Sequence, residues 1–188
     1  MQRKQRTMSG LPLIGLVGYT NAGKTTLLHK AVSLSGSSAP IPSGENKLFA
    51  TLDPLVRKVK TTGGREVLLS DTVGFIQKLP HHLLHAFLGT LEEVQNADLL
   101  IHVLDAAHPE ALERAKTVQT VLEQLGCADK PTVTILNKLD KVTETAEVER
   151  LAQVFSHPVP ISLLHTTTLK PVWQEVEFLI NSIQSQLI

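Results

Sequence analysis

The residues best suited to chemistry form the segment 18–25, which has the sequence GYTNAGKT. It fits the pattern G-x-x-x-x-G-K-[ST], in which backbone N–H groups surround the phosphates of a nucleotide and the lysine reaches the terminal ones. An apolar run over 13–17 precedes it and a helix-compatible stretch over 24–34 follows, which is the context that such a loop needs. The sequence therefore predicts a nucleoside triphosphate site with contacts from Gly18, Asn21, Ala22, Gly23, Lys24, Thr25 and Thr26.

A second motif, NKLD at 137–140, follows another apolar run and predicts which base is bound. The Asp140 carboxylate can accept hydrogen bonds from both N1–H and the 2-amino group of guanine. Adenine lacks this pair of donors, and a mismatch of this kind discriminates by about 10⁴-fold. We expect Asn137 to tie this loop to the phosphate loop and to face the base oxygen, and the stem of Lys138 to cover one face of the ring. The ligand is therefore predicted to be GTP or GDP, and an ATPase is disfavoured.

Two further segments suit a magnesium ion and a γ-phosphate. Asp71 ends a predicted strand, and its carboxylate together with the Thr25 hydroxyl suits Mg²⁺. Thr51, in the loop LFATLDP, is the best candidate for a second hydroxyl on the metal, and Gly74 can donate its N–H to the γ-phosphate. The alternatives are that Asp71 caps a helix and that Thr51 is an ordinary loop residue. The predicted catalytic set is Lys24, Thr51 and Gly74.

The strings GYTNAGKTTL, LFATLDP, DTVGFIQKLPHHLLHAFLGTLEE and NKLD resemble the G domain of the HflX family of ribosome-associated GTPases. The resemblance is strong from about residue 11 to residue 140 and weaker beyond. It implies a Ras-like G domain that binds GTP with Mg²⁺, and hydrolysis coupled to binding of the large ribosomal subunit, in ribosome splitting, rescue or assembly. Two alternatives stay open: a nucleotide-dependent binding module with little hydrolysis, and another ribosome-associated GTPase similar to translation factors.

The chain departs from this family in two places. The fifth guanine loop of the family has Ser-Ala followed by a small or basic residue, whereas the nearest candidate here is Ser162-Leu163-Leu164. Because the family's contact is made largely by backbone N–H, Ser162 is retained as a predicted guanine contact. The N-terminal domain of the family has no counterpart. Residues 1–10 resemble only the last basic piece of its linker, so we expect an excised or truncated G domain over 11–188.

Phe75 occupies the position after Asp-x-x-Gly where many small GTPases carry a glutamine that orients the attacking water. Because a phenylalanine side chain cannot form that hydrogen bond, we expect slow hydrolysis by the isolated chain. Two sources of the missing group are open. One is a K⁺ ion at Asn21, the position of the loop asparagine in potassium-stimulated GTPases with G-x-x-N-x-G-K, and the other is the ribosome.

The order of the elements predicts an α/β fold of three layers, a P-loop fold with a mostly parallel six-stranded sheet and one antiparallel edge strand. Asp105 should end a strand and cap the turn after it. The predicted strands are 13–17, 54–60, 65–70, 99–104, 132–136 and 159–161. The predicted helices are 24–34, 80–96, 109–126, 145–155 and 171–183.

Composition limits the remaining function classes. The chain has 188 residues, 42% of them hydrophobic, which suits one globular domain. Eighteen basic and eighteen acidic residues cancel, so we expect no strong nucleic-acid binding by this domain alone, and we expect a monomer. The single cysteine, Cys127, fits a reducing compartment, and no stretch has transmembrane length. A cytoplasmic location follows, with the mitochondrial or chloroplast matrix left open.

Overall fold

The computed structural model describes residues 10–36, 55–71 and 88–185. Strands and helices alternate along the described chain except at one pair of consecutive strands, as the sequence predicted. Its elements are β1 (Leu13–Val17), α2 (Lys24–Leu34), β2 (Leu55–Lys60), β3 (Glu66–Asp71), α4 (Leu88–Asn96), β4 (Leu99–Asp105), α5 (Ala111–Gln124), β5 (Thr132–Asn137), the 3₁₀ turn η2 (Leu139–Lys141), α6 (Thr145–Ala152), β6 (Pro158–Pro160) and α7 (Lys170–Ser185).

The six strands form one sheet in the order β2-β3-β1-β4-β5-β6. Every neighbouring pair is parallel except β2 and β3, which form an antiparallel hairpin and place β2 at the edge. The predicted mostly parallel sheet with one antiparallel edge strand is therefore confirmed. All five residues of β1, LIGLV, are buried, as expected for a central strand that is covered on both faces. The carboxyl ends of β1, β3, β4 and β5 meet at one edge of the sheet, where α/β folds place their ligands.

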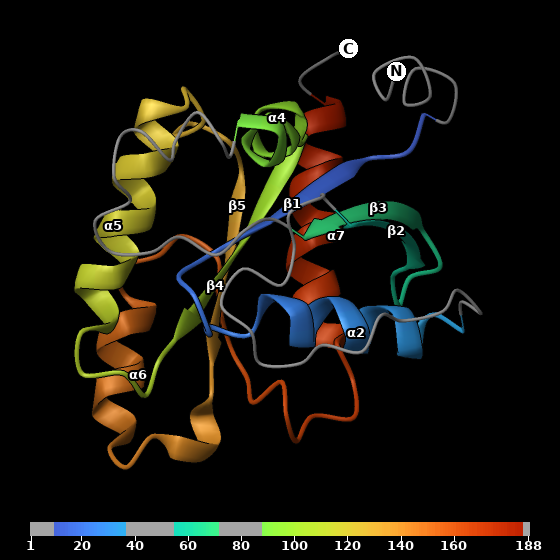
Figure 1. Ribbon diagram of the computed structural model, residues 1–188. Coiled ribbons are helices and arrows are strands. Elements are labelled where there is room, and N and C mark those ends of the chain that lie inside the picture. Colours follow the sequence, from blue (N-terminus) through green and yellow to red (C-terminus); the bar gives the residue numbers. More distant parts are fainter. Residues whose placement is uncertain (1–9, 37–54, 72–87, 186–188) are drawn as a thin grey trace.

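Helices cover both faces of the sheet, which gives the predicted three layers (Figure 1). On one face α2 and α7 pack against the strands around Ile101, and the lone Trp173 of α7 belongs to this core. On the other face α4 and α5 cover Leu100, while α5 and α6 cover Leu136. Burying a large apolar side chain of this kind stabilises the fold by roughly 1.5–3 kcal/mol, so these two cores hold the ligand edge of the sheet in place.

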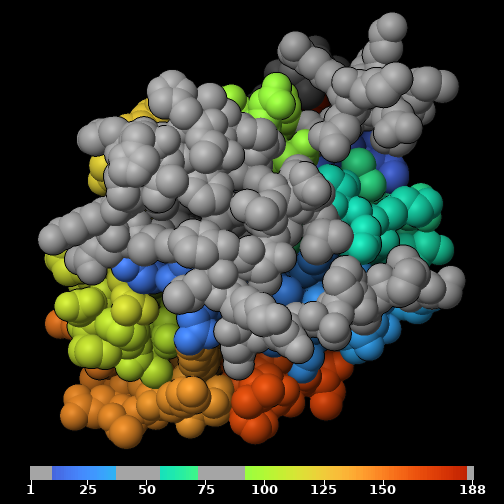
Figure 2. Space-filling view, viewed as in Figure 1, coloured from blue at the N-terminus to red at the C-terminus, as the bar shows by residue number. Residues whose placement is uncertain are grey.

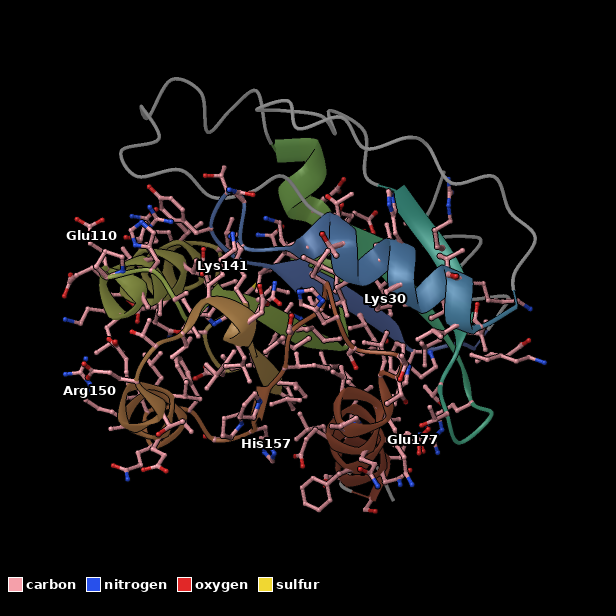
Figure 3. The ribbon with its side chains drawn as sticks, turned by 90° about the horizontal axis from the view of Figure 1, so that it is seen from below. Lys30, Glu110, Lys141, Arg150, His157 and Glu177 are labelled. Atoms are coloured by element: carbon pink, nitrogen blue, oxygen red, sulfur yellow. The ribbon has the colours of Figure 1, made fainter. Side chains whose placement is uncertain are left out.

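The last helix, α7, is amphipathic and also anchors the β2–β3 hairpin. The Thr61 hydroxyl donates to the Glu177 carboxylate, and the Arg65 guanidinium donates to Asn181 Oδ1 at 2.8 Å. Figure 3 shows Glu177 on the side of α7 that faces the hairpin turn. In the described parts of the chain, no helix is long and apolar enough to cross a membrane.

Several element boundaries differ from the prediction by one to three residues; α7, for example, runs over 170–185 rather than 171–183. α5 begins at Ala111 rather than Pro109, because the N–H of Ala111 bonds to the carbonyl of His108 at 2.9 Å and so places Pro109 in a turn. α6 ends at Ala152 rather than at residue 155, and the N–H of Val154 closes a tighter turn on Leu151. β6 lies one residue earlier than predicted, over 158–160. The predicted start of the helix 80–96 falls outside the described residues, whereas its end at residue 96 is confirmed.

Candidate nucleotide-binding site

The phosphate loop runs from the end of β1 to the first turn of α2 and depends on two glycines. Gly18 has φ of 149° and Gly23 has φ of 115°, which are backbone angles that other residues rarely adopt. A Cβ atom at Gly18 would collide with the backbone oxygen of Val103, and one at Gly23 would collide with the side-chain amide of Asn137. The loop can therefore pack closely against β4 and β5 only with glycine at both positions.

The start of α2 offers positive charge to an anion. None of the residues in its first turn is acidic, and the N–H groups and helix dipole at this end favour an anion. Lys24 is buried, and its Nζ donates to the carbonyls of Gly18 at 3.0 Å and Tyr19 at 3.3 Å. Burial lowers the pKa of Lys24 to about 8, partly offset by the nearby Asp71 carboxylate. An anion at this helix terminus would stabilise the charged form of Lys24.

The other predicted residues of the phosphate loop occupy consecutive positions around this turn. Asn21 is exposed in a left-handed conformation with φ of 59°, and Ala22 is buried with its N–H bonded to the carbonyl of Tyr19 at 3.2 Å. Thr25 and Thr26 follow Lys24 in the first turn of α2 and are exposed. The structure thus brings together all seven predicted residues of this loop.

The predicted metal site joins α2 to the end of β3. The Thr25 hydroxyl donates to Asp71 Oδ2 at 3.0 Å, and Asp71 itself is buried. Strand pairing explains the meeting, because β3 lies beside β1 with Asp71 in register with Leu16 just before the phosphate loop. A hydroxyl and a carboxylate oxygen are ligands that Mg²⁺ prefers, so these residues fit the ion. Thr51 and Gly74, the other predicted contacts, lie outside the part of the chain that the structure describes.

On the base side of the site, Asn137 connects three loops. Its Nδ2 donates to the carbonyl of Ala22 at 2.7 Å, and its Oδ1 accepts from the N–H of Leu163 at 3.0 Å. The side chain is buried at the end of β5. The sequence predicted the tether to the phosphate loop but not the second bond, which holds the loop after β6 against the same edge of the sheet.

Asp140 and Ser162 lie together at the rim of this edge. The Ser162 hydroxyl donates a hydrogen bond to Asp140 Oδ1, and His165 Nε2 lies 4.0 Å from Asp140 Oδ2. The bond from Ser162 is the main reason that the pKa of Asp140 is lowered, which favours the carboxylate that accepts hydrogen bonds. In Figure 2 the surfaces of η2 and α6 (orange) and of the loop after β6 (orange-red) lie side by side. The candidate guanine loop is therefore adjacent to the NKLD turn.

Lys138, the third predicted contact in the NKLD motif, forms an ion pair that sequence reasoning missed. Its Nζ lies 2.7 Å from Asp105 Oδ2, and only 20% of the Lys138 side chain and 14% of the Asp105 side chain are exposed. Asp105 also accepts from the N–H of Ala107 at 3.2 Å, so the predicted capping role is confirmed. The position of Asp105 at a strand end next to β5 was the signal that could have indicated the pair.

Two other contacts support the loops of the site. Lys30 of α2 donates through Nζ to the carbonyls of Thr166 at 2.6 Å and Leu164 at 3.4 Å, which ties the loop after β6 to the phosphate-loop helix (Figure 3). The Arg114 guanidinium lies 4.5 Å from the ring centroid of Tyr19, within cation–π distance. Neither contact has a local sequence pattern, because each joins residues from distant elements.

Comparison with known proteins places this geometry in a family. A family model described as "50S ribosome-binding GTPase" matches residues 13–138. The GTPase HflX of Caldanaerobacter subterraneus is 51% identical over 140 residues, which cover 74% of this chain and 31% of that protein. The GTPase HflX of Escherichia coli is 42% identical over 142 residues, which cover 76% and 32%. The chain thus spans about a third of the length of these relatives.

Solved structures agree with this assignment. A GTP-binding protein from Sulfolobus solfataricus in complex with GDP has a TM-score of 0.69 and 30% identity, covering 97% of this chain and 56% of that one. A probable GTP-binding protein engB, at 20% identity and a TM-score of 0.61, supports the fold alone. Because the family model matches most of the chain and its relatives share the same phosphate-loop fold, the chain belongs to the HflX family of GTPases.

Proposed function

We propose that this chain is a Mg²⁺-dependent switch that binds and hydrolyses GTP, and that it acts with the large ribosomal subunit. The observation that carries the nucleotide part is the double tether of Asn137, which bonds to Ala22 of the phosphate loop and to Leu163 of the loop after β6. One side chain thereby fixes the distance between the phosphate-binding loop and the carboxylate of Asp140. A nucleotide whose phosphates lie on α2 has its base within reach of that carboxylate.

The base is proposed to be guanine because of the state and position of Asp140. The Ser162 hydrogen bond favours the ionised carboxylate, which accepts the N1–H and 2-amino donors of guanine. Bound adenine would leave this carboxylate unpaired. Lys138 covers one face of the base with its stem, and the loop beginning at Ser162 contacts the base oxygen.

The phosphates are proposed to bind between Lys24 and the candidate Mg²⁺ site at Thr25 and Asp71. Thr25, Asp71 and Thr51 would hold Mg²⁺, which neutralises charge on the phosphate oxygens. Lys24 is buried, and its Nζ bonds to two carbonyls of the phosphate loop. From this position it would contact the β- and γ-phosphates. The N–H of Gly74 would donate to the γ-phosphate.

Hydrolysis by the chain alone is proposed to be slow, because Phe75 cannot orient water through its side chain. Asn21 is exposed on the loop surface and offers an amide oxygen for K⁺, which would supply positive charge where an arginine finger acts in other GTPases. The ribosome is the other source of the missing group. If neither accelerates the reaction, the chain is a nucleotide-dependent binding module.

The large ribosomal subunit is proposed as the partner on the strength of the family model, which is described as a 50S ribosome-binding GTPase. The neutral charge balance of the chain, with 18 basic and 18 acidic residues, argues against strong binding of RNA by this domain alone. We therefore place part of the ribosome contact in regions of the relatives that this chain does not span. A monomer in the cytoplasm, or in an organelle matrix, is consistent with this function.

Single-turnover hydrolysis tests the proposal. The chain, in molar excess over the nucleotide, is mixed with GTP labelled at the γ-phosphate. The reaction is run in Na⁺ or K⁺, with and without large ribosomal subunits. We expect tight GTP binding in each case, slow cleavage in Na⁺ alone, and faster cleavage with subunits or K⁺. Asn21→Ala should abolish the K⁺ effect and leave the subunit effect.

The outcomes separate the candidate functions. Equal rates in Na⁺ and K⁺ would remove the cation from the mechanism. Tight GTP binding with slow hydrolysis that neither K⁺ nor subunits accelerate would favour the binding module. A chain that does not bind GTP at all would overturn the proposal.

A further inference from the structure

We propose that Asp105 is a positioning residue of the guanine site, which acts by holding the Lys138 side chain flat against the bound base. This inference rests on the proposed function. It starts from the ion pair between Lys138 Nζ and Asp105 Oδ2 at 2.7 Å, which joins the NKLD turn to the end of β4. Both side chains are mostly buried, so water screens this pair less than it screens a surface pair.

The Asp105 carboxylate is positioned by contacts that do not involve Lys138. Asp105 ends β4 in register with Asn137 of β5, and the N–H of Ala106 bonds to the carbonyl of Asn137 at 2.9 Å. The other carboxylate oxygen of Asp105 accepts from the N–H of Ala107. Strand pairing and this turn thus fix the carboxylate in place, and it can serve as an anchor.

Lys138, by contrast, needs an anchor. It has φ of 65°, a left-handed conformation that is unfavourable for a residue with a side chain, and it carries four rotatable methylene groups. Without a partner, its ammonium group would gain hydration and conformational freedom in solvent. The pair with Asp105 instead draws the stem across the edge of the sheet from β5 towards β4.

This direction places the methylene groups beside the base site. Asp140, which reads the edge of guanine, lies two residues further along the same turn, and Asn137 binds the phosphate loop one residue before. A stem held between these points forms an apolar wall along one face of the ring. Because it contacts the face rather than the donor edge, it should lengthen the residence time of the nucleotide without selecting the base.

A purely structural role would also explain the pair, since an ion pair of this burial can stabilise the junction of β4 and β5. The two explanations differ in what they predict for Lys138. If Asp105 acts only on folding, its removal lowers stability but leaves nucleotide dissociation unchanged. If it acts through Lys138, removal accelerates dissociation, and the effect disappears once the ammonium group of Lys138 is gone.

A double-mutant cycle on the full chain makes this distinction. Release of a fluorescent GDP analogue is followed by stopped flow with an excess of GDP for the wild type, Asp105→Asn, Lys138→Met and the double variant. Both single variants break the same ion pair, and methionine keeps an apolar stem. We expect each to accelerate release by roughly tenfold, and the double variant to be no faster than either.

Controls separate the positioning role from folding and from base selection. Asp129→Asn removes an exposed carboxylate after α5 and should release GDP at the wild-type rate. Asp105→Glu keeps the charge and should recover most of the residence time. The preference for GDP over IDP, which lacks the 2-amino group, should stay at the wild-type value in Asp105→Asn and fall in Asp140→Asn. Melting temperatures are measured for every variant.

Three results would overturn the inference. Wild-type release from Asp105→Asn would limit the residue to a structural role, and effects that add in the double variant would show that Asp105 does not act through Lys138. If Asp105→Asn does not fold, wild-type release from Lys138→Met alone would refute the anchor. A wild-type chain that binds no GDP overturns the proposed function as well, whereas the other results leave it intact.

Discussion

The hydroxyl of Thr25 lies 3.0 Å from a carboxylate oxygen of Asp71, although the two residues are 46 positions apart. Thr25 lies at the start of α2, the helix after the phosphate loop, and Asp71 lies at the end of β3. Parallel pairing of β1 with β3 is what brings them together. The meeting of Thr25 and Asp71 at the proposed Mg²⁺ site thus follows from the sheet topology.

Thr25→Ala should therefore remove the magnesium-dependent part of nucleotide affinity. We expect GDP to bind at least about tenfold more weakly than to the wild type in Mg²⁺, because a ligand of the ion is lost. Isothermal titration with GDP in Mg²⁺ and in EDTA measures this difference. Thr25→Ser keeps the hydroxyl and should retain the magnesium effect, and an unchanged magnesium effect in Thr25→Ala would refute the assignment.

Asp140→Asn should change which base is bound. An amide presents one donor and one acceptor, which match the C2 carbonyl and N1–H of xanthine, whereas guanine offers two donors. We expect GDP affinity to fall by about 100-fold or more while XDP affinity rises. Competition against a fluorescent nucleotide measures both, and retention of the preference for GDP would show that Asp140 does not read the base.

Nucleotide affinity should depend on pH through Lys24, whose pKa is lowered by burial to about 8. Phosphates raise this pKa in the complex. Below pH 8 the ammonium is already charged in the free protein, so this group adds no pH dependence. Above pH 8 the free protein loses the proton that the complex keeps, so affinity falls as pH rises and binding takes up a proton.

Calorimetry at pH 8.5 in two buffers of different ionisation enthalpy measures that uptake. We expect roughly 0.7 proton per GDP from Lys24 at pH 8.5 and almost none at pH 6.5. Lys24→Arg stays charged at both values and should lose the uptake even if it binds GDP more weakly. No uptake by the wild type at pH 8.5 would contradict the lowered pKa.

Stability should fall in acid because of His102. This histidine on β4 is buried, its Nε2 has no hydrogen-bond partner within the described residues, and burial lowers its pKa to about 4. The unfolded chain binds a proton near pH 6.5 and the folded chain does not. The contribution of His102 is therefore complete above pH 6.5 and is lost as pH falls towards 4.

Urea unfolding at pH 7.5 and pH 5 tests this assignment. Between these values the wild type should lose roughly 2 kcal/mol more stability than His102→Leu, because the other histidines titrate in both proteins. Equal losses in the two proteins would show that another group is responsible.

Most of the fold follows from local sequence patterns. The buried run of β1, the Thr61–Gly64 turn between β2 and β3, and the glycine after α5 each act within a few residues, and the sheet was predicted from them. The errors were local as well. Proline at position 109 suggested a helix start, but this residue lies in the turn closed by the bond from Ala111 to His108, and the helix begins after that turn.

Site residues were predictable from the sequence only where a known motif includes the residue and also indicates its role. The phosphate loop and the NKLD turn are such motifs, and the structure brings them to one edge. The Asp105–Lys138 pair and the Lys30 tether were missed because they depend on which strands are neighbours and where side chains end. Such contacts join residues that are more than 30 positions apart and carry no shared pattern.

Competition between GTP and ATP for the wild-type chain in Mg²⁺ tests the central claim most directly. A fluorescent GDP analogue is displaced by each nucleotide in turn. The account predicts that ATP needs about 10⁴-fold higher concentration than GTP, because adenine leaves the Asp140 carboxylate unpaired. Displacement by ATP and GTP at similar concentrations would contradict it.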